Sequence, residues 1–114
     1  MDKTSRIYVA GHRGLAGSAI CRRLQADGYT NLILRDRKQV DLCDQRAVDA
    51  FFAAEKPEYV FVAAAKVGGI LANRTYPVEF LRDNLSIEIN LIDAAHRHRA
   101  KKLEFLGSSC IYPK

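Results

Sequence analysis

The chain has few of the features that mark a disulfide-bonded or membrane-spanning protein. Its three cysteines lie far apart and form no Cys-x-x-Cys pair, so a reducing compartment is the simplest interpretation. It has no apolar run long enough to cross a membrane, and the polar residues 1–6 do not resemble a signal peptide. We therefore expect a cytoplasmic protein without a membrane partner.

A long basic run and a metal-binding cluster are also missing. The 18 Lys and Arg outnumber the 13 Asp and Glu, yet the densest basic stretch, residues 96–102, falls at an expected helix end, where cations suit the helix dipole. His96 and His98 are two apart on that helix and point away from each other. We expect no nucleic acid and no metal, and a phosphate-rich small ligand fits the charge better.

Apolar β-branched runs alternate with helix-like patterns, and no repeat, linker or low-complexity segment interrupts them. This alternation predicts one α/β domain with a doubly wound parallel sheet that stops after its fifth strand. We expect strands at about 6–10, 31–35, 59–64 and 103–106, a short strand or turn at 40–42, and helices at about 14–27, 45–55 and 78–97.

The helical patterns also predict which side chains are buried. We expect the first helix to end at Gly28 and to face the sheet with Leu15, Ala16, Ala19, Ile20 and Leu24. The second should end near Pro57 and bury Ala47, Val48, Phe51 and Phe52. The long last helix is apolar all round except for a narrow polar stripe, so it should bury a second face against another helix or subunit. That stripe is Glu79, Arg82 or Asp83, Ser86, Asn90, Asp93 and Arg97.

Three glycines, Gly11, Gly14 and Gly17, follow the first strand and open the first helix. Strand, glycine turn and helix in this order present a helix N-terminus to the pyrophosphate of a dinucleotide, as in the NAD(P)-binding Rossmann fold. The alternative is a glycine-rich turn without a ligand, which we consider the weaker interpretation. The cofactor-binding set at this turn is Gly11, His12, Arg13, Gly14, Leu15, Ala16 and Gly17.

The residues after the second strand favour NADP(H) over NAD. That segment contains Arg35, Arg37 and Lys38, and Arg13 of the glycine turn is expected nearby. A guanidinium group can bind a 2′-phosphate with two hydrogen bonds. Asp36 could instead serve as the acidic residue with which NAD enzymes hold the ribose, and a solvated charged turn is the third interpretation.

Further candidates follow the other strands, at the edge of the sheet where ligands bind. Asp41, beside Leu42, could accept a hydrogen bond from an adenine amino group or cap the second helix, which Asp44 can also do. Small residues Ala64 and Ala65 leave room for a cofactor after the fourth strand. Leu106 ends the fifth, and Gly107, Ser108 and Cys110 follow it, where a hydroxyl can donate to a substrate carbonyl and a thiol can move a proton.

Three segments resemble the GDP-L-fucose synthases, a family of extended short-chain dehydrogenases/reductases. They are Gly11-His12-Arg13-Gly14-Leu15-Ala16-Gly17, Ala63-Ala64-Ala65-Lys66-Val67-Gly68-Gly69 and Gly107-Ser108-Ser109-Cys110-Ile111-Tyr112-Pro113. The resemblance implies NADPH, with Arg13 and Arg37 at the 2′-phosphate, and a GDP-linked keto-sugar that is epimerised at C3 and C5 and reduced at C4. It implies that Ser108 bonds the C4 oxygen, that Cys110 transfers a proton, and that the enzyme is a homodimer.

The sequence departs from that family in having no Tyr-x-x-x-Lys helix, which would lie beyond Lys114. We therefore expect residues 1–114 to be the N-terminal part of the NADP-binding domain, without the substrate domain and inactive alone, because the acid for the C4 oxygen is missing. Two alternatives are a non-catalytic NADP(H)-binding module and a fragment that folds only with a partner chain.

Overall fold

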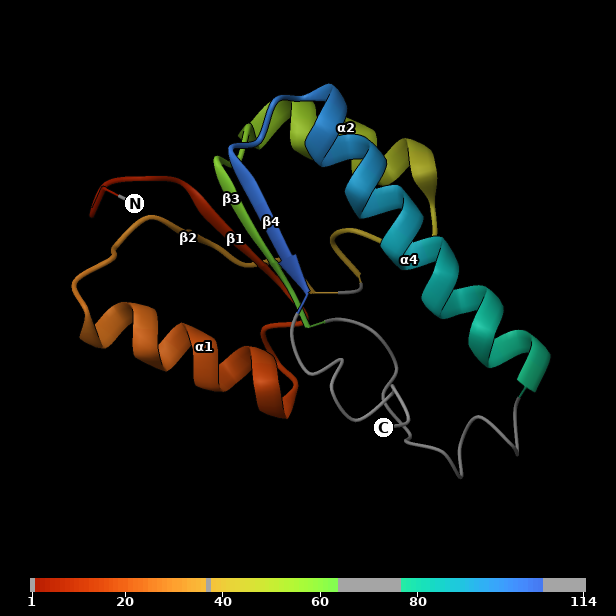
Figure 1. The fold of residues 1–114 in the computed structure, drawn as a ribbon, viewed down its shortest axis with the longest axis horizontal. Helices are drawn as coiled ribbons and strands as arrows, with labels where there is room; N and C mark the ends of the chain where they lie inside the picture. Colours follow the sequence, from red (N-terminus) through yellow and green to blue (C-terminus); the bar gives the residue numbers. More distant parts are fainter. Residues whose placement is uncertain (1, 37, 64–76, 106–114) are drawn as a thin grey trace.

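The fold is a parallel sheet with helices on both faces. The computed structural model describes residues 2–36, 38–63 and 77–105, and Figure 1 shows helix α1 on one face of the sheet and helices α2 and α4 on the other. The elements are β1 (Ile7–Ala10), α1 (Leu15–Ala26), β2 (Leu32–Ile33), α2 (Gln45–Glu55), β3 (Tyr59–Val62), α4 (Pro77–Arg97) and β4 (Lys102–Phe105). The predicted α/β class is confirmed. No described helix is long and apolar enough to span a membrane.

The strand order is β2-β1-β3-β4, and every neighbouring pair is parallel. Strand β1 pairs with β2 at Ile7–Leu32 and with β3 along its whole length, up to Ala10–Val62. The chain therefore runs from β1 outward to β2 and then crosses back over β1 to β3. In open α/β sheets, ligands bind beyond the carboxyl ends of the strands at such a reversal.

Strand β1 forms the centre of the core because its four residues are at most 1% exposed. Ile7 and Val9 point toward α1 and pack with Cys21 and Leu24. Tyr8 and Ala10 point to the opposite face, where Phe51, Phe52, Val48 and Leu91 cover them. Burial raises the pKa of the Tyr8 phenol well above its usual value. Both faces of β1 are thus sealed, as expected for a central parallel strand.

Two strand predictions need correction. The second strand comprises only Leu32 and Ile33 rather than 31–35, and Leu32 is only partly buried because β2 lies at the edge of the described sheet. Residues 40–42, expected as a short strand or turn, form no strand, so the described sheet has four strands instead of five. Backbone bonds from Gln39 and Val40 back to the Asp36 carbonyl, both 3.0 Å, curl the chain there and prevent pairing.

The buried face of α1 also differs from the prediction. Gly17, Cys21 and Leu24 are buried, whereas Leu15, Ala16 and Ala19 are exposed. The reason is the third glycine of the turn, because a Cβ on Gly17 would lie 1.9 Å from the Gly11 carbonyl oxygen. The helix therefore touches the loop through Gly17, and its buried positions follow at i, i+4 and i+7 from that contact.

The end of α1 and the start of α2 lie where the sequence predicts them. Gly28 adopts φ +95°, and the N–H groups of Gly28 and Tyr29 bond to the carbonyls of Gln25 and Leu24, which is the Schellman pattern that ends a helix. Helix α2 begins at Asp44, whose side chain accepts bonds from Arg46 and Ala47 N–H. Of its four predicted core residues, Val48, Phe51 and Phe52 are buried and Ala47 is partly buried.

Helix α4 buries one apolar face and exposes another. Ile87, Leu91, Ala94 and Ala95 are buried against the sheet and α2, while Leu85, Ile89 and Ile92 are 54%, 60% and 48% exposed. The predicted second apolar face is therefore present. The prediction for Asn90 is wrong, because it belongs to the buried face and not to a solvent-facing polar stripe.

The basic end of α4 is attached to α2. Asp49 accepts hydrogen bonds from Arg97 (2.6 Å) and approaches His98 Nε2 at 2.8 Å. The hydrogen bond to His98 is the largest cause that holds the pKa of the Asp49 carboxyl below its usual value, and the Arg97 charge adds to it. The predicted location of the basic stretch at a helix end is confirmed, and Arg97 and His98 share a carboxylate of the neighbouring helix as partner.

Candidate functional site

The glycine turn is shaped by the first and third glycines. Gly11 has φ +83°, a conformation that residues with a side chain rarely adopt, and its carbonyl accepts the N–H of Gly14 at 3.1 Å. Gly17 packs directly on that carbonyl, so a side chain at 17 would overlap the backbone. Both glycines are therefore required by the chain's own geometry.

Gly14 is different, because nothing in the described protein requires a glycine there. A Cβ at Gly14 would meet only the Gly11 carbonyl oxygen, at an ordinary 3.5 Å, and the backbone angles of −76° and 173° suit any residue. The residue is exposed. The free space above Gly14 lets an external group approach the backbone closely, which is the role of the second glycine in a dinucleotide turn.

The N-terminus of α1 is open. Gly14 supplies no side-chain cap, and the first turn contains no acidic residue. The first helical bond runs from Ser18 N–H to the Gly14 carbonyl at 2.9 Å, so the N–H groups of Leu15, Ala16 and Gly17 have no helical acceptor. Leu15 is 91% exposed, which keeps this end accessible. These donors and the helix dipole make the end suitable for an anion.

Arg13 extends from the glycine turn to the end of β2, as predicted. Its Nη1 lies 3.8 Å from Asp36 Oδ2, and its side chain is 76% exposed. Asp36 is itself fixed by Gln39, whose N–H donates to Asp36 Oδ1 (3.0 Å) and whose Oε1 accepts the Asp36 N–H (2.9 Å). The guanidinium therefore lies between the two segments that a dinucleotide ribose would contact, with its role there still a prediction.

Arg35 does not join this cluster. Its guanidinium pairs with Glu55 of α2 at 3.4 Å and lies 5.7 Å from the centre of the Phe51 ring. These contacts place the Arg35 guanidinium beside α2 rather than beside Arg13, and a contribution of Arg35 to 2′-phosphate binding stays a prediction. Arg37 lies outside the described residues.

The turn at residues 41–43 shows how Asp41 and Asp44 divide their roles. Asp44 caps α2, so the capping alternative for Asp41 is wrong. Asp41 Oδ1 accepts the Cys43 N–H at 3.0 Å, and no partner is found for Oδ2 among the described residues. The Leu42 carbonyl accepts a 2.9 Å bond from Asn90 Nδ2 on α4. Sequence reasoning missed this contact, although a lone asparagine between apolar residues could have indicated it.

His12 has a buried ring nitrogen, Nδ1, without a hydrogen-bond partner in the part of the chain that is described. Buried polar atoms are rarely left unpaired, so the turn has an unused donor or acceptor as well as open amides. The remaining predicted site residues, Ala64, Ala65, Leu106, Gly107, Ser108 and Cys110, lie outside the described residues. Strands β3 and β4, which precede them in the sequence, end in register at Val62 and Phe105.

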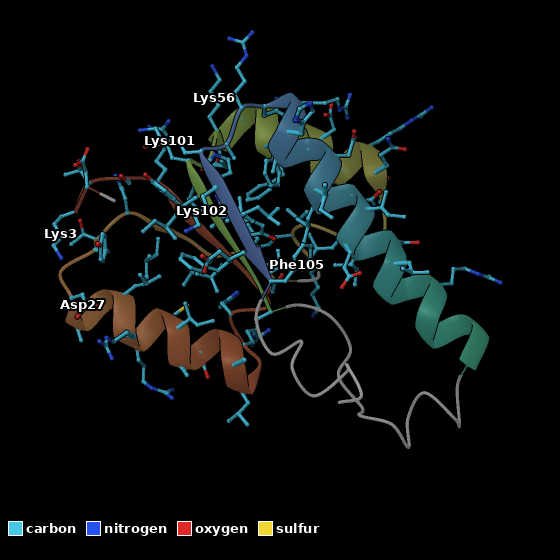
Figure 2. The ribbon with its side chains drawn as sticks, in the orientation of Figure 1. Lys3, Asp27, Lys56, Lys101, Lys102 and Phe105 are labelled. Carbon is cyan, nitrogen blue, oxygen red and sulfur yellow. The ribbon has the colours of Figure 1, made fainter. Side chains whose placement is uncertain are left out.

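The opposite, amino-terminal end of the sheet is closed by ion pairs. Glu58 accepts the Arg6 N–H at 3.1 Å and pairs with Lys101 at 3.3 Å. Both contacts lower the pKa of the Glu58 carboxyl, and the hydrogen bond from Arg6 is the larger cause. Lys3 donates to the Asp27 carbonyl. Figure 2 shows Lys56 and Lys101 at this end and Phe105 at the other.

Metal binding finds no support in the described part of the chain, where no group of three His, Cys, Asp or Glu could hold an ion. The site therefore consists of an open helix N-terminus, a glycine turn and one extended arginine. Such an arrangement can bind and orient a phosphate-bearing ligand, and its described residues contain no nucleophile or general acid placed for chemistry.

Comparison with known proteins agrees with this arrangement. Residues 7–114 match the model of the NAD dependent epimerase/dehydratase family. The chain is 60% identical over 114 residues to the putative GDP-L-fucose synthase 2 of Arabidopsis thaliana and 56% identical over 109 residues to the GDP-L-fucose synthase of Escherichia coli strain K12. These alignments cover 100% and 96% of this chain but 35% and 34% of the relatives, so the chain spans about a third of their length.

A solved structure has the same fold. MlghC, a GDP-mannoheptose C4 reductase from Campylobacter jejuni with NADP bound, matches with a TM-score of 0.86 and 43% sequence identity. The match covers 92% of this chain and 31% of that one. The glycine turn, the parallel sheet with its reversal at β1 and β3, and the family match over residues 7–114 lead to one conclusion. The chain belongs to the NAD dependent epimerase/dehydratase family.

Proposed function

We propose that residues 1–114 are the N-terminal part of the NADP(H)-binding domain of a cytoplasmic enzyme of the GDP-L-fucose synthase type. Such an enzyme epimerises a GDP-linked 4-keto-sugar at C3 and C5 and reduces it at C4 with NADPH. The open N-terminus of α1 above Gly14 carries the proposal, because it offers backbone donors and space that the described residues do not use. The similarity to two GDP-L-fucose synthases and to an NADP-bound GDP-sugar reductase supports the substrate class and the cofactor.

In this proposal the pyrophosphate lies at the glycine turn, residues 11–17, and the 2′-phosphate lies between Arg13 and Arg37. Asp41 Oδ2 accepts the adenine amino group beside Leu42, and Ala64, Ala65 and residues 106–108 line the cofactor. NADPH, when bound, supplies the hydride for C4. Ser108 donates to the C4 oxygen, and Cys110 transfers a proton during epimerisation. In this proposal, the substrate-binding part and the acid for the C4 oxygen are supplied by the portion of such an enzyme that the alignments with the relatives leave uncovered.

The cofactor assignment is tested by titrating the full product of the gene with NADPH and NADH and following nicotinamide fluorescence. Arg13→Ala combined with Arg37→Ala should weaken NADPH at least about 10-fold more than NADH, because only NADPH carries the 2′-phosphate. Arg22→Ala, which removes an exposed arginine of α1, is the control for lost charge and should change neither affinity. Equal losses for both cofactors would contradict the 2′-phosphate assignment.

The roles of Ser108 and Cys110 separate the two reactions. Cys110→Ser should slow the exchange of solvent deuterium into C3 and C5 of the GDP-4-keto-sugar more than it slows C4 reduction, because the thiol transfers the epimerising proton. Ser108→Ala should slow C4 reduction directly, by about 10²–10⁴-fold if it assists proton transfer to the oxygen. A Cys110→Ser variant in which both reactions slow equally would assign that cysteine a structural role.

The exposed apolar residues of α4 support a homodimer in this proposal. Leu85, Ile89 and Ile92 form the second apolar face of the helix, and such patches mark protein interfaces. Ile89→Glu should convert a dimeric full-length protein to monomers in light scattering, whereas Glu88→Gln on the adjacent position should not. A dimer that survives Ile89→Glu would place the interface elsewhere.

A further inference from the structure

We infer that Asn90 of α4 is a positioning residue for the adenine end of the cofactor. It acts through the adenine-side turn, which we define as residues 41–43. The inference rests on the proposed function, because it assumes that a dinucleotide lies at the carboxyl ends of β1 and β2. It adds a role for Asn90 that the glycine pattern does not indicate.

Asn90 occupies an apolar environment in which its amide needs a partner. The residue is 9% exposed, and Ile87, Leu91 and Ala94 on the same face of α4 are buried in the core. A buried amide without a hydrogen bond is costly, so the polar side chain is tolerated only where it finds an acceptor. Its acceptor is the Leu42 carbonyl, at 2.9 Å.

That bond connects two segments that are 48 residues apart in the sequence. The adenine-side turn is closed locally by the bonds from Cys43 N–H to Asp41 Oδ1 and from Asp44 N–H to the Asp41 carbonyl, both 3.0 Å. Those local bonds fix the conformation of the turn, but they do not fix its position relative to the sheet and α4. The Leu42 side chain packs against the core, and the Asn90 amide donates to the Leu42 carbonyl.

The consequence is a fixed direction for Asp41. With Oδ1 occupied by Cys43 N–H, Oδ2 is the oxygen available to an adenine amino group. Binding groups must be held within about 0.5 Å of their productive geometry to act fully. Asn90, which does not touch the ligand, sets the position of the backbone from which this oxygen projects.

Asn31 provides a matched control. Its Nδ2 also donates to a main-chain carbonyl, that of Thr4, at 2.8 Å, but it lies before β2 at the amino end of the sheet. Asn90→Leu and Asn31→Leu therefore remove the same kind of bond at opposite ends of the strands. Asn90→Ser, whose hydroxyl leaves room for water, serves as a second variant if the leucine variant does not fold.

The experiment compares NADPH with the analogue that carries hypoxanthine in place of adenine and so lacks the amino group. Affinities are measured on the full product of the gene. The unaltered protein should prefer NADPH, and this preference should fall about 2- to 10-fold in Asn90→Leu, which is the range of one hydrogen bond. Asn31→Leu should keep the preference unchanged. In an Asp41→Ala background the preference should already be lost, and Asn90→Leu should add nothing.

Three results would overturn the inference, and they differ from a failure of the proposed function. If Asn90→Leu and Asn90→Ser keep the full preference for adenine, the amide does not position Asp41. If both cofactors weaken equally, Asn90 has only a general structural role. If the unaltered protein binds NADPH without any preference, the inference fails together with the Asp41 assignment. Absence of NADPH binding to the unaltered protein would instead refute the proposed function itself.

Discussion

Helices α1 and α2 begin at the same end of the sheet, but only α2 closes its own N-terminus. Asp44 accepts the N–H groups of Arg46 (3.0 Å) and Ala47 (3.4 Å), so two of the amides that every helix leaves unpaired are satisfied. Helix α1 begins at Gly14, with no side-chain cap and no acidic residue in its first turn. A capped helix end has a structural role, and an uncapped one beside a glycine turn is available to a ligand.

The two helices are also positioned differently. Helix α1 is placed by backbone contact, since Gly17 lies against the Gly11 carbonyl. Helix α2 is placed by side chains, through the rings of Phe51 and Phe52 against Tyr8, 4.7 and 6.0 Å between ring centres, and through Asp49 to α4. A helix set by backbone contact allows a ligand close to its N-terminus, and it tolerates no added atom at the contact.

The largest effect is expected from Gly17→Ala. The new methyl group would lie 1.9 Å from the Gly11 carbonyl oxygen, where backbone must move to accommodate it. We expect the free energy of unfolding to fall by about 3 kcal/mol, at the upper end of overpacking effects, and NADPH affinity to fall with it. Urea denaturation followed by circular dichroism measures the first. A variant of unchanged stability would mean that α1 does not rest on this contact.

Gly14→Asp is expected to give α1 a side-chain N-cap like the one that Asp44 provides for α2. The space at Gly14 accepts a Cβ, and its extended backbone is that of an N-cap. Stability should stay equal or rise by a few tenths of a kcal/mol, because aspartate is a better cap than glycine. NADPH affinity should fall about 100-fold, because the carboxylate occupies the donors and repels phosphate. Gly14→Ala, the uncharged control, should weaken binding less in the same fluorescence titration.

Asp44→Ala makes the opposite change by opening the N-terminus of α2. Loss of the two cap bonds should lower the free energy of unfolding by about 1 kcal/mol. NADPH affinity should stay within about twofold, because a cap of α2 is not a cofactor contact in this assignment. Thermal unfolding and titration of the same sample measure both quantities. A large loss of affinity with little loss of stability would place the cofactor at α2 instead.

The smallest effect concerns the link between α2 and α4. The pKa of Asp49 is held below its ordinary value of 3.8 by its hydrogen bond to His98 and by Arg97. A carboxyl with a lowered folded-state pKa stabilises the fold above 3.8, and this stabilisation is lost as the pH falls through the lower folded value. Asp49→Asn should therefore be less stable than the unaltered protein at pH 6, and the difference in the free energy of unfolding should shrink as the pH falls below 3.8. A difference that is constant with pH would show that the ion pair has no linkage to folding.

The features that are local in sequence could be predicted. The glycine spacing, the alternation of strands and helices, the end of α1 at Gly28 and the core of α2 each depend on neighbouring residues. The length of β2 could not, because an apolar run such as Leu32-Ile33-Leu34 does not show how many of its residues find a partner strand. The buried face of α1 also depends on a contact with Gly11, which periodicity within the helix does not contain.

The candidate site divides in the same way. The glycine turn and the position of Arg13 near Asp36 follow from the order of the elements. The behaviour of Arg35 does not, because its partner Glu55 is twenty positions later, on a helix whose placement is a tertiary property. The role of Asn90 cannot be predicted for the same reason, since helical periodicity does not reveal that the Leu42 carbonyl lies opposite.

The complete burial of β1 has a consequence for hydrogen exchange. Its amides lie between two parallel neighbours, with both faces of the strand covered, so solvent deuterium reaches them only when the whole domain opens. Exchange at Val9 therefore reports the global free energy of unfolding, whereas β4, at the edge of the described sheet, exchanges through smaller openings. Any ligand that binds only the folded state slows exchange at β1 by a factor of 1 + [L]/Kd. Hydrogen exchange at β1 therefore measures cofactor affinity without any need for turnover.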